Sequence, residues 1–417
     1  MIYELFNYEV CTLNYDPTNY LNQTNMKYSF SFSCIPTVLL MLVCFAFNDQ
    51  QKELKKSFAN VIIKEKYSIP STCSGMFLEA RADALGREYL YVAAKDAGLK
   101  IFKADGSTTP VASYSVDSFR SLHVMNFSQS GNLLFLALGN HFGNGTQAPG
   151  MAIIDVADPM HPFIRSVWQD GSAHGGAGIV EADGKYAYVG GMRNGIYILD
   201  ISDPSKPKYL SNYIPPLDFP DAKYSARKIN ARGMLVKNDM LYLCYDAGGL
   251  RVINLFDKRH PVEIGRYSNP EMNGRPRAYN NIMIDDTIAY IAVDYCGMEI
   301  LNIKDPMNIK RISWWNPWNC QASSMKWFSS NGHCNEIALD KTNHLAFISS
   351  GKSDLMVVDV SDPQRPNYKQ VFGGVSNKMG TWGVSLNGNS IYLTYICAVV
   401  PFFSNWTGVK VLSYTLQ

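Results

Sequence analysis

Seven short apolar segments recur along the chain, separated from their neighbours by turn-forming residues. Each begins with glycine or aspartate and continues with β-branched, aromatic and leucine side chains, a composition typical of buried strands. Successive copies start 45 to 57 residues apart. A repeat of this period indicates an architecture built from copies of one unit. The copies are Gly98–Phe102, Gly150–Val156, Gly195–Ile201, Gly249–Leu255, Gly297–Ile303, Asp354–Val360 and Gly408–Tyr414.

Each unit is predicted to contain four strands. One apolar segment lies directly before each copy, an innermost strand lies before that, and a turn with a fourth strand follows the first six copies. The segments before the copies are Tyr89–Ala93, Leu133–Ala137, Tyr186–Gly190, Leu241–Tyr245, Ala289–Val293, Leu345–Ser349 and Ile391–Tyr395. The innermost strands include His123–Phe127, Gly178–Ala182, Met234–Asn238, Asn281–Asp285, Glu336–Asp340 and Val384–Gly388. Four antiparallel strands in a unit of about 50 residues describe a β-propeller blade.

The turn after several copies has the pattern D-x-x-D-P. It occurs at Asp155–Pro159, Asp200–Pro204 and Asp359–Pro363. The aspartate accepts hydrogen bonds from its own backbone, and the proline fixes φ at a position that needs no donor. We therefore assign this pattern a structural role and no catalytic one.

The two ends of the repeat region predict how the ring closes. The last copy runs to Gln417 without a fourth strand, whereas Val61–Ile69 is a strand without a blade of its own. Pairing that strand with the last blade removes two exposed sheet edges. The sequence therefore predicts an all-β fold, a seven-bladed β-propeller over residues 57–417, with the ring closed by the N-terminal strand.

The third strands and their turns resemble a known family. The segments GIYILDISDPSKP, LMVVDVSDPQRP and GLRVINLFDKRHP are similar to the repeats of LVIVD-repeat proteins, which are secreted or surface-exposed propellers. The resemblance covers the chain after its N-terminal segment, and its motifs are structural. It implies a propeller fold and an exported location, but it brings no reaction and no functional residues.

The N-terminal segment has the features of an export signal. Residues 35–47 are uncharged and apolar, and Met26-Lys27 supplies a start and a positive charge before them. This run is too short to span a bilayer but fits a signal peptide. We expect residues 1–25 to be an upstream extension, 26–47 a signal peptide and 48–56 a linker. Lipidation at Cys44 and cleavage after Ala46 are the two alternatives, so a membrane contact is expected only through a lipid anchor.

Charge and cysteine usage exclude several classes. The chain has 38 basic and 36 acidic residues, a balance that argues against a nucleic-acid-binding protein. No CxxC pair occurs, so a structural zinc site is not expected. No cofactor motif is present, and we expect a monomer without a cofactor. Cys320 and Cys334 flank one loop, and a disulfide between them is the pairing considered at this point.

Basic and aromatic residues gather in the loops expected at one face of the ring. The candidate ligand-binding residues there are Arg120, His123, His174, Arg227, Arg232, Arg277, Tyr279, His333 and Trp382. Such a face favours an anionic ligand, because guanidinium groups match carboxylate and sulfate geometry. Arg120, Arg227 and Arg277 occupy similar positions in three blades, so struts between blades are the competing interpretation. The histidines are too scattered for a local metal motif, although His123, His174 and His333 could converge on the axis.

A long connection over residues 316–332 adds Trp318 and Trp327. Long loops on a rigid scaffold are frequently functional, and exposed indole rings stack on sugars. The competing interpretation is that these rings fill the groove between blades.

These observations predict an exported cell-surface or periplasmic propeller that binds an extracellular ligand such as an anionic polysaccharide. One alternative is a lyase or hydrolase of anionic glycans, in which His174, His333 and Tyr279 would transfer protons beside an arginine. Another is a scaffold that binds a surface protein. The sequence alone leaves open whether the protein is an enzyme.

Overall fold

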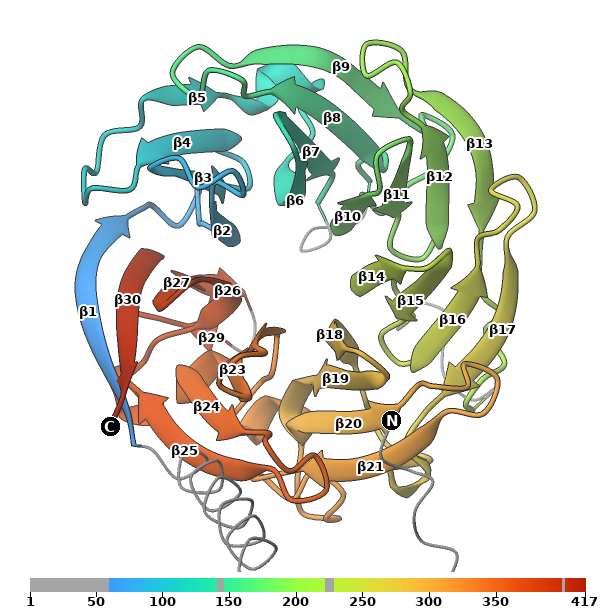
Figure 1. The fold of residues 1–417 in the computed structure, drawn as a ribbon, viewed down its shortest axis with the longest axis vertical. Coiled ribbons are helices and arrows are strands. Elements are labelled where there is room, and N and C mark those ends of the chain that lie inside the picture. Colours follow the sequence, from blue (N-terminus) through green and yellow to red (C-terminus); the bar gives the residue numbers. More distant parts are fainter. Residues whose placement is uncertain (1–59, 141–145, 222–228, 400–401) are drawn as a thin grey trace, which may run out of the picture. The chain divides into compact units, whose positions relative to one another are not determined.

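Seven four-stranded antiparallel sheets form a ring around a common axis (Figure 1). The computed structural model describes residues 60–140, 146–221, 229–399 and 402–417. The predicted extension, signal peptide, Cys44 and linker lie outside the described residues, as does Arg227. The described part contains no helix with the length and hydropathy needed to cross a membrane. The arrangement confirms the predicted seven-bladed all-β propeller.

In the first six blades the innermost strand comes first in the sequence, as Figure 1 shows. The first blade contains β2 (Glu79–Ala82), β3 (Tyr89–Ala93), β4 (Leu99–Lys103) and β5 (Ala112–Tyr114). The second contains β6 (Val124–Ser130), β7 (Leu133–Leu138), β8 (Gly150–Asp155) and β9 (Phe163–Gln169). The third contains β10 (Ile179–Ala182), β11 (Tyr186–Gly190), β12 (Ile196–Asp200) and β13 (Lys208–Tyr213). The fourth blade contains β14 (Gly233–Lys237), β15 (Met240–Cys244), β16 (Leu250–Asn254) and β17 (Val262–Tyr267). The fifth contains β18 (Tyr279–Asp285), β19 (Ile288–Val293), β20 (Met298–Asn302) and β21 (Lys310–Trp315). The sixth contains β22 (Glu336–Asp340), β23 (Leu345–Ser349), β24 (Leu355–Asp359) and β25 (Asn367–Phe372).

The seventh blade joins the two ends of the described chain. Its sheet order is β1 (Val61–Pro70), β30 (Gly408–Leu416), β27 (Ser390–Tyr395) and β26 (Thr381–Asn387). The register of β1 and β30 runs from Val61 opposite Leu416 to Pro70 opposite Gly408. The N-terminal strand therefore closes the ring, as predicted.

Short elements occupy the connections. A two-stranded ribbon is formed by β28 (Ala398–Val399) and β29 (Phe402–Phe403). The 3-10 helices are η1 (Val116–Phe119), η3 (Pro270–Met272), η4 (Asp294–Cys296), η5 (Trp327–Ser329), η6 (Gly351–Ser353) and η7 (Val375–Asn377).

The D-x-x-D-P turns have the structure that the sequence indicated. Asp155 Oδ1 accepts a hydrogen bond from the backbone N–H of Ala157 at 2.9 Å, and Asp158 Oδ1 accepts one from Met160 at 2.9 Å. Asp359 and Asp362 repeat these contacts in the sixth blade. These aspartates therefore fix the turn between the third and fourth strands.

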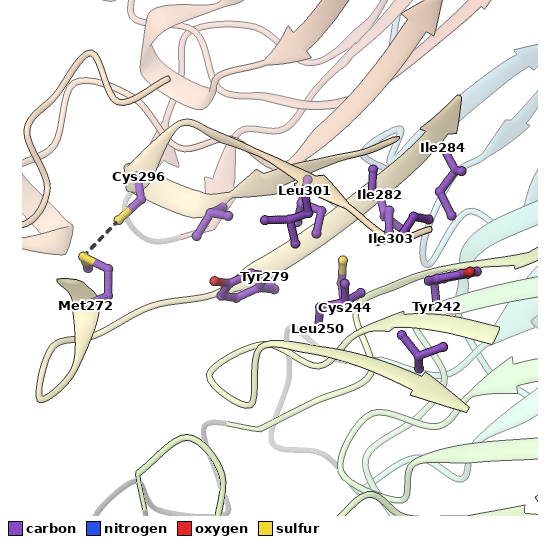
Figure 2. Packing of buried hydrophobic residues seen from close by; sticks show 14 of the residues in the cluster. Tyr242, Cys244, Leu250, Met272, Tyr279, Ile282, Ile284, Cys296, Leu301 and Ile303 are labelled. Atoms are coloured by element: carbon purple, nitrogen blue, oxygen red, sulfur yellow. Dashed lines mark hydrogen bonds between the residues drawn. The ribbon is translucent and has the colours of Figure 1, made fainter. Parts of the chain in front are cut away.

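The hydrophobic core lies between blades. Seven clusters of buried side chains each combine residues of two neighbouring blades, including the pair formed by the last and first blades. Figure 2 shows one of them, where Tyr242 and Leu250 of the fourth blade face Ile282 and Leu301 of the fifth. Each blade is thus buried on both faces, which explains why its strands are apolar on both sides.

Candidate functional site

The loops between second and third strands meet the start of the next inner strand. At five of the junctions between blades, a backbone carbonyl of the loop region accepts a hydrogen bond from the N–H of a residue at or just before that strand. The bonds join Val124 to Lys95, Ala177 to Leu138, Ala231 to Met192, Tyr279 to Asp246 and Cys334 to Asp294, at 2.7 to 3.1 Å. These loops therefore lie together on one side of the ring, which we call the loop face.

A charged cluster lies on the inner strands at the axis. Arg81 Nε donates to Glu79 Oε1 at 3.1 Å, and Asn126 Nδ2 donates to Glu79 Oε2 at 3.3 Å. The carboxyl group of Glu336 in the sixth blade lies close enough to that of Glu79 in the first for the two groups to interact. Gly383 of the seventh blade lies between them, and a Cβ on it would be 3.5 Å from Glu336 Oε2. We call Glu79, Arg81, Asn126 and Glu336 the axial cluster.

Burial sets the protonation of the axial carboxyl groups. Desolvation raises the pKa of Glu336 well above its ordinary value, the charge of Glu79 raises it further, and Arg81 opposes the shift. Desolvation also raises the pKa of Glu181 to about 7, again opposed by Arg81. Burial and the charge of Glu79 therefore both favour the protonated form of the Glu336 carboxyl group.

A cavity of about 20 Å³ lies on the axis beside this cluster. It is lined by Met125, Asn126, Gly178, Arg232, Asn280, Asn335, Glu336 and Trp382. The guanidinium of Arg232 lies 5.3 Å from the ring centroid of Trp382, which connects the fourth and seventh blades across the axis. A space of this volume holds a water molecule or a single ion, not a sugar ring.

A second polar network lies on the loop face at the fifth and sixth blades. His333 Nδ1 lies 2.6 Å from Asp294 Oδ1, and Trp327 Nε1 donates to Asp294 Oδ2 at 2.7 Å. The two rings pack edge to face with centroids 5.2 Å apart, and His333 is 1% exposed. Burial raises the pKa of the nearby Asp246 to about 6, with Arg232 opposing. This network fixes the long loop against the blades.

An open groove of about 550 Å³ lies at the rim, between β21 and the turn that follows β24. It is lined by Glu271, Arg311, Ile312, Ser313, Trp314, Trp315, Asn316, Pro317, Gln364 and Pro366. Trp314 Nε1 donates to the carbonyl of Cys296 at 2.7 Å, and the guanidinium of Arg311 lies 5.7 Å from a Trp314 ring centroid. Arg311 also forms an ion pair with Glu271. We call this the rim groove, and it combines an aromatic ring with charged and amide groups.

The predicted histidines occupy three different surroundings. His174 is exposed, with Nδ1 3.0 Å from the carbonyl oxygen of Thr146. His123 is half-buried, and desolvation lowers its pKa, with Lys95 adding to the shift. His333 is buried against Asp294.

Among the predicted arginines, Arg120 is exposed and has a left-handed backbone with φ of 58°. Arg277 is buried and donates to Ser268 Oγ at 2.9 Å, in the connection before β18. Two asparagines join neighbouring blades close to the axis. Asn280 Nδ2 donates to the carbonyl of Cys334, and Asn335 Nδ2 donates to that of Thr381, both at 2.8 Å.

The predicted aromatic residues pack mainly against the protein. Tyr279 is fully buried and donates to Glu299 Oε2 at 2.9 Å. Trp318 packs against Trp315 with ring centroids 6.0 Å apart and covers Gly332, where a Cβ would be 1.8 Å from its ring. These contacts fit the interpretation that the loop aromatics fill spaces between elements.

Sequence reasoning missed the axial carboxyl pair and the rim groove. Glu79 and Glu336 carry no motif, and only their place on inner strands links them. Polar residues on otherwise apolar inner strands were the signal that could have identified them. Trp314 lies on the outermost strand β21, a position that indicated no pocket.

The cysteines pair differently from the arrangement considered in the sequence. Cys320 forms a disulfide with Cys296, and Cys73 forms one with Cys397. Cys334 is a free, buried thiol at the start of β22, where its backbone N–H donates to Asp294. Cys320 instead faces η4 of the fifth blade, against which the loop folds back.

No group of three or more histidine, cysteine, aspartate or glutamate side chains in the described ranges is arranged to hold a metal ion. Of the two cavities described above, the rim groove has the volume for an organic ligand.

Comparisons with known proteins agree with the fold. The family model of the LVIVD repeat matches residues 174–214 and 343–372. The WD40 repeats of RRP9 give a TM-score of 0.59 at 9% identity, covering 86% of this chain and 98% of that one. The β-propeller domain of Cps50 (Swd1) from Myceliophteria thermophila gives 0.58 at 13% identity, covering 85% and 100%. No curated protein matches the chain. At such identities the likeness concerns the fold alone.

Proposed function

This chain is an LVIVD-repeat β-propeller, and we propose that it is an exported binding protein whose ligand is an extracellular carbohydrate. The observation that carries the proposal is the rim groove, whose volume of about 550 Å³ is that of a small-molecule site. The axial cavity is too small for a sugar.

The lining of the rim groove suits a sugar ring. The indole of Trp314 offers an apolar face, and Asn316, Gln364 and Glu271 offer hydrogen-bonding groups for hydroxyls. Trp314 is held by its hydrogen bond to Cys296. An aromatic ring that is already fixed loses little conformational entropy when a ligand binds.

Arg311 is the residue that would recognise an anionic sugar. Its guanidinium pairs with Glu271, which is about half exposed. Exposed ion pairs contribute only ~0–1 kcal/mol, so a uronate carboxylate could replace Glu271 at small cost. This supports an anionic polysaccharide as the ligand class.

The disulfides support an exported location. Both pairs lie in the propeller, and such bonds persist in oxidising compartments. They agree with the predicted signal peptide and with the alternative of a lipid anchor at Cys44.

We favour binding over catalysis because the proposed proton-transfer residues are engaged separately. Tyr279 contacts Glu299 in the core, His333 contacts Asp294, and His174 is exposed near Thr146. A lyase would need an acid and a base beside one substrate atom.

The test is binding of the purified protein to neutral, uronate-bearing and sulfated polysaccharides. Trp314→Ala should weaken binding about tenfold, because the stacking surface is lost. Arg311→Ala should weaken binding to uronate polymers more than to neutral ones. Phe256→Ala is the matched control, since Phe256 is an 87% exposed aromatic residue away from the groove.

Equal affinity of wild type and Trp314→Ala, with both proteins folded by thermal melting, would refute the groove as the site. Absorbance from an unsaturated uronate product during the same incubation would instead show a lyase.

A further inference from the structure

More carboxyl than guanidinium groups lie near the axial cavity. Glu79, Glu336 and Glu181 all interact electrostatically with Arg81. Arg81 is bound to Glu79, and Arg232, which lines the cavity with Glu336, is held over the ring of Trp382. Inner strands β6, β18 and β26 contribute no charged side chain to the axial cavity lining.

Oxygen atoms dominate what this site offers to a ligand. Asn126 is 4% exposed, and its Oδ1 has no hydrogen-bond partner among the described residues. Asn280 and Asn335 line the same cavity, and each has donated its amide N–H to the next blade. Their remaining carboxamide oxygens are acceptors, as is the carboxyl group of Glu336.

The fold makes room for these groups at one point. Gly383 has no side chain, and a Cβ there would also lie 2.6 Å from the carbonyl oxygen of Leu78. Because the seventh blade carries no side chain at this position, the side chain of Glu336 can extend past Gly383 towards Glu79. The cavity beside them, about 20 Å³, admits one atom-sized ligand.

We propose that the axial cavity binds one hard cation, with Glu336 and Asn126 Oδ1 as ligands and Glu79 behind them. All candidate ligand atoms are oxygen, which hard ions such as Na⁺, Mg²⁺ and Ca²⁺ prefer. The cavity of about 20 Å³ has room for one ion. This proposal is independent of the carbohydrate site at the rim.

The test uses Tb³⁺ as a luminescent substitute for Ca²⁺, with the purified full chain in metal-free buffer. Trp382 lines the cavity and can transfer excitation to a bound Tb³⁺. We expect saturable emission from the wild type that Ca²⁺, Mg²⁺ or Na⁺ displaces, which identifies the preferred ion. Glu336→Gln should weaken Tb³⁺ binding about tenfold or more. This variant should fold, because glutamine has nearly the same shape as glutamic acid and removes no buried apolar contact.

Two variants serve as controls. Glu88→Gln removes an exposed carboxylate away from the axis and should leave Tb³⁺ binding unchanged. Trp382→Phe should remove the sensitised emission but keep the rise in melting temperature that Tb³⁺ causes. Absence of both saturable emission and a melting shift in the folded wild type overturns the proposal. Equal Tb³⁺ affinity of wild type and Glu336→Gln also overturns it.

Discussion

Individual buried polar residues hold the connections of this propeller in place. Glu299 is fully buried and accepts hydrogen bonds from Asn269 Nδ2 and from the Tyr279 hydroxyl, both at 2.9 Å. Arg251 is also fully buried, and it pairs with Glu263 while donating to two carbonyls of the preceding connection. Such groups are costly to bury unless every partner is present. Their role is therefore to fix one path for the chain between blades.

The buried position of Glu299 predicts a pH dependence of stability. Desolvation raises its pKa from 4.5 to about 7, although hydrogen bonds from Asn269 and Tyr279 oppose the shift. The folded state thus binds this proton more tightly than the unfolded state, so the contribution is complete below about pH 4 and is lost as the pH rises through 7. From pH 5 to pH 8, wild type should lose about 2–3 kcal/mol of unfolding free energy relative to Glu299→Gln.

Urea unfolding of both proteins at pH 5 and pH 8 measures this difference. Parallel pH profiles for wild type and Glu299→Gln would show that the carboxyl group titrates normally.

At the scale of elements, a glycine with a left-handed backbone begins the third strand in four of the blades. Gly98, Gly195, Gly249 and Gly297 have φ between 72° and 81°. A Cβ on any of them would lie 1.9 to 2.3 Å from the carbonyl oxygen that ends the outermost strand of the same blade. The recurring glycine is therefore required both by its backbone conformation and by the close approach of the fourth strand.

Gly249→Ala and Gly86→Ala separate these two causes. Gly86 has a φ of 76° with no atom within 4 Å of a Cβ, whereas a Cβ on Gly249 would lie 2.3 Å from the carbonyl oxygen of Tyr267. Gly86→Ala should cost about 1 kcal/mol through backbone strain alone. Gly249→Ala should cost about 1–3 kcal/mol more, because the outer strand must move. Chemical denaturation gives both values, and equal losses would assign the whole effect to φ.

The strands and their order could be predicted because each repeat carries its own apolar pattern and turn chemistry. The axial cluster could not, since Glu79 and Glu336 approach each other only when the first and sixth blades enclose Gly383. The pairing of Cys320 also depended on tertiary structure, because its loop folds back towards the fifth blade. Patterns within a blade are local in sequence, whereas contacts across the ring are not. The candidate site was accordingly harder to predict than the fold.

At the scale of the whole molecule, stability depends on the closure of the ring. Every apolar cluster between blades needs two neighbours, and the cluster between the last and first blades includes Ile69, Phe77 and Tyr392. The disulfide Cys73–Cys397 lies at the same junction and joins residues 324 positions apart. Opening this junction exposes an apolar flank on each side of the break.

Removing the junction disulfide should cost more than removing the loop disulfide. Cys296 and Cys320 are 24 positions apart, compared with 324 for Cys73 and Cys397. If loop entropy dominates, replacing Cys73 and Cys397 by serine should lower the unfolding free energy about 2 kcal/mol more than replacing Cys296 and Cys320. Guanidinium unfolding of the two double variants tests this. A larger loss in the Cys296/Cys320 variant would place the main restraint at the long loop.

The pairing of β1 with β30 also has a consequence for the timing of folding. If the chain is exported as proposed above and is threaded N-terminus first through a narrow channel, β1 emerges long before its partner β30. The seventh blade therefore cannot assemble while any part of β30 is still in transit. Until then the preceding blades form an open ring whose two end blades expose apolar faces. The ring closes only after the whole of β30 has been released.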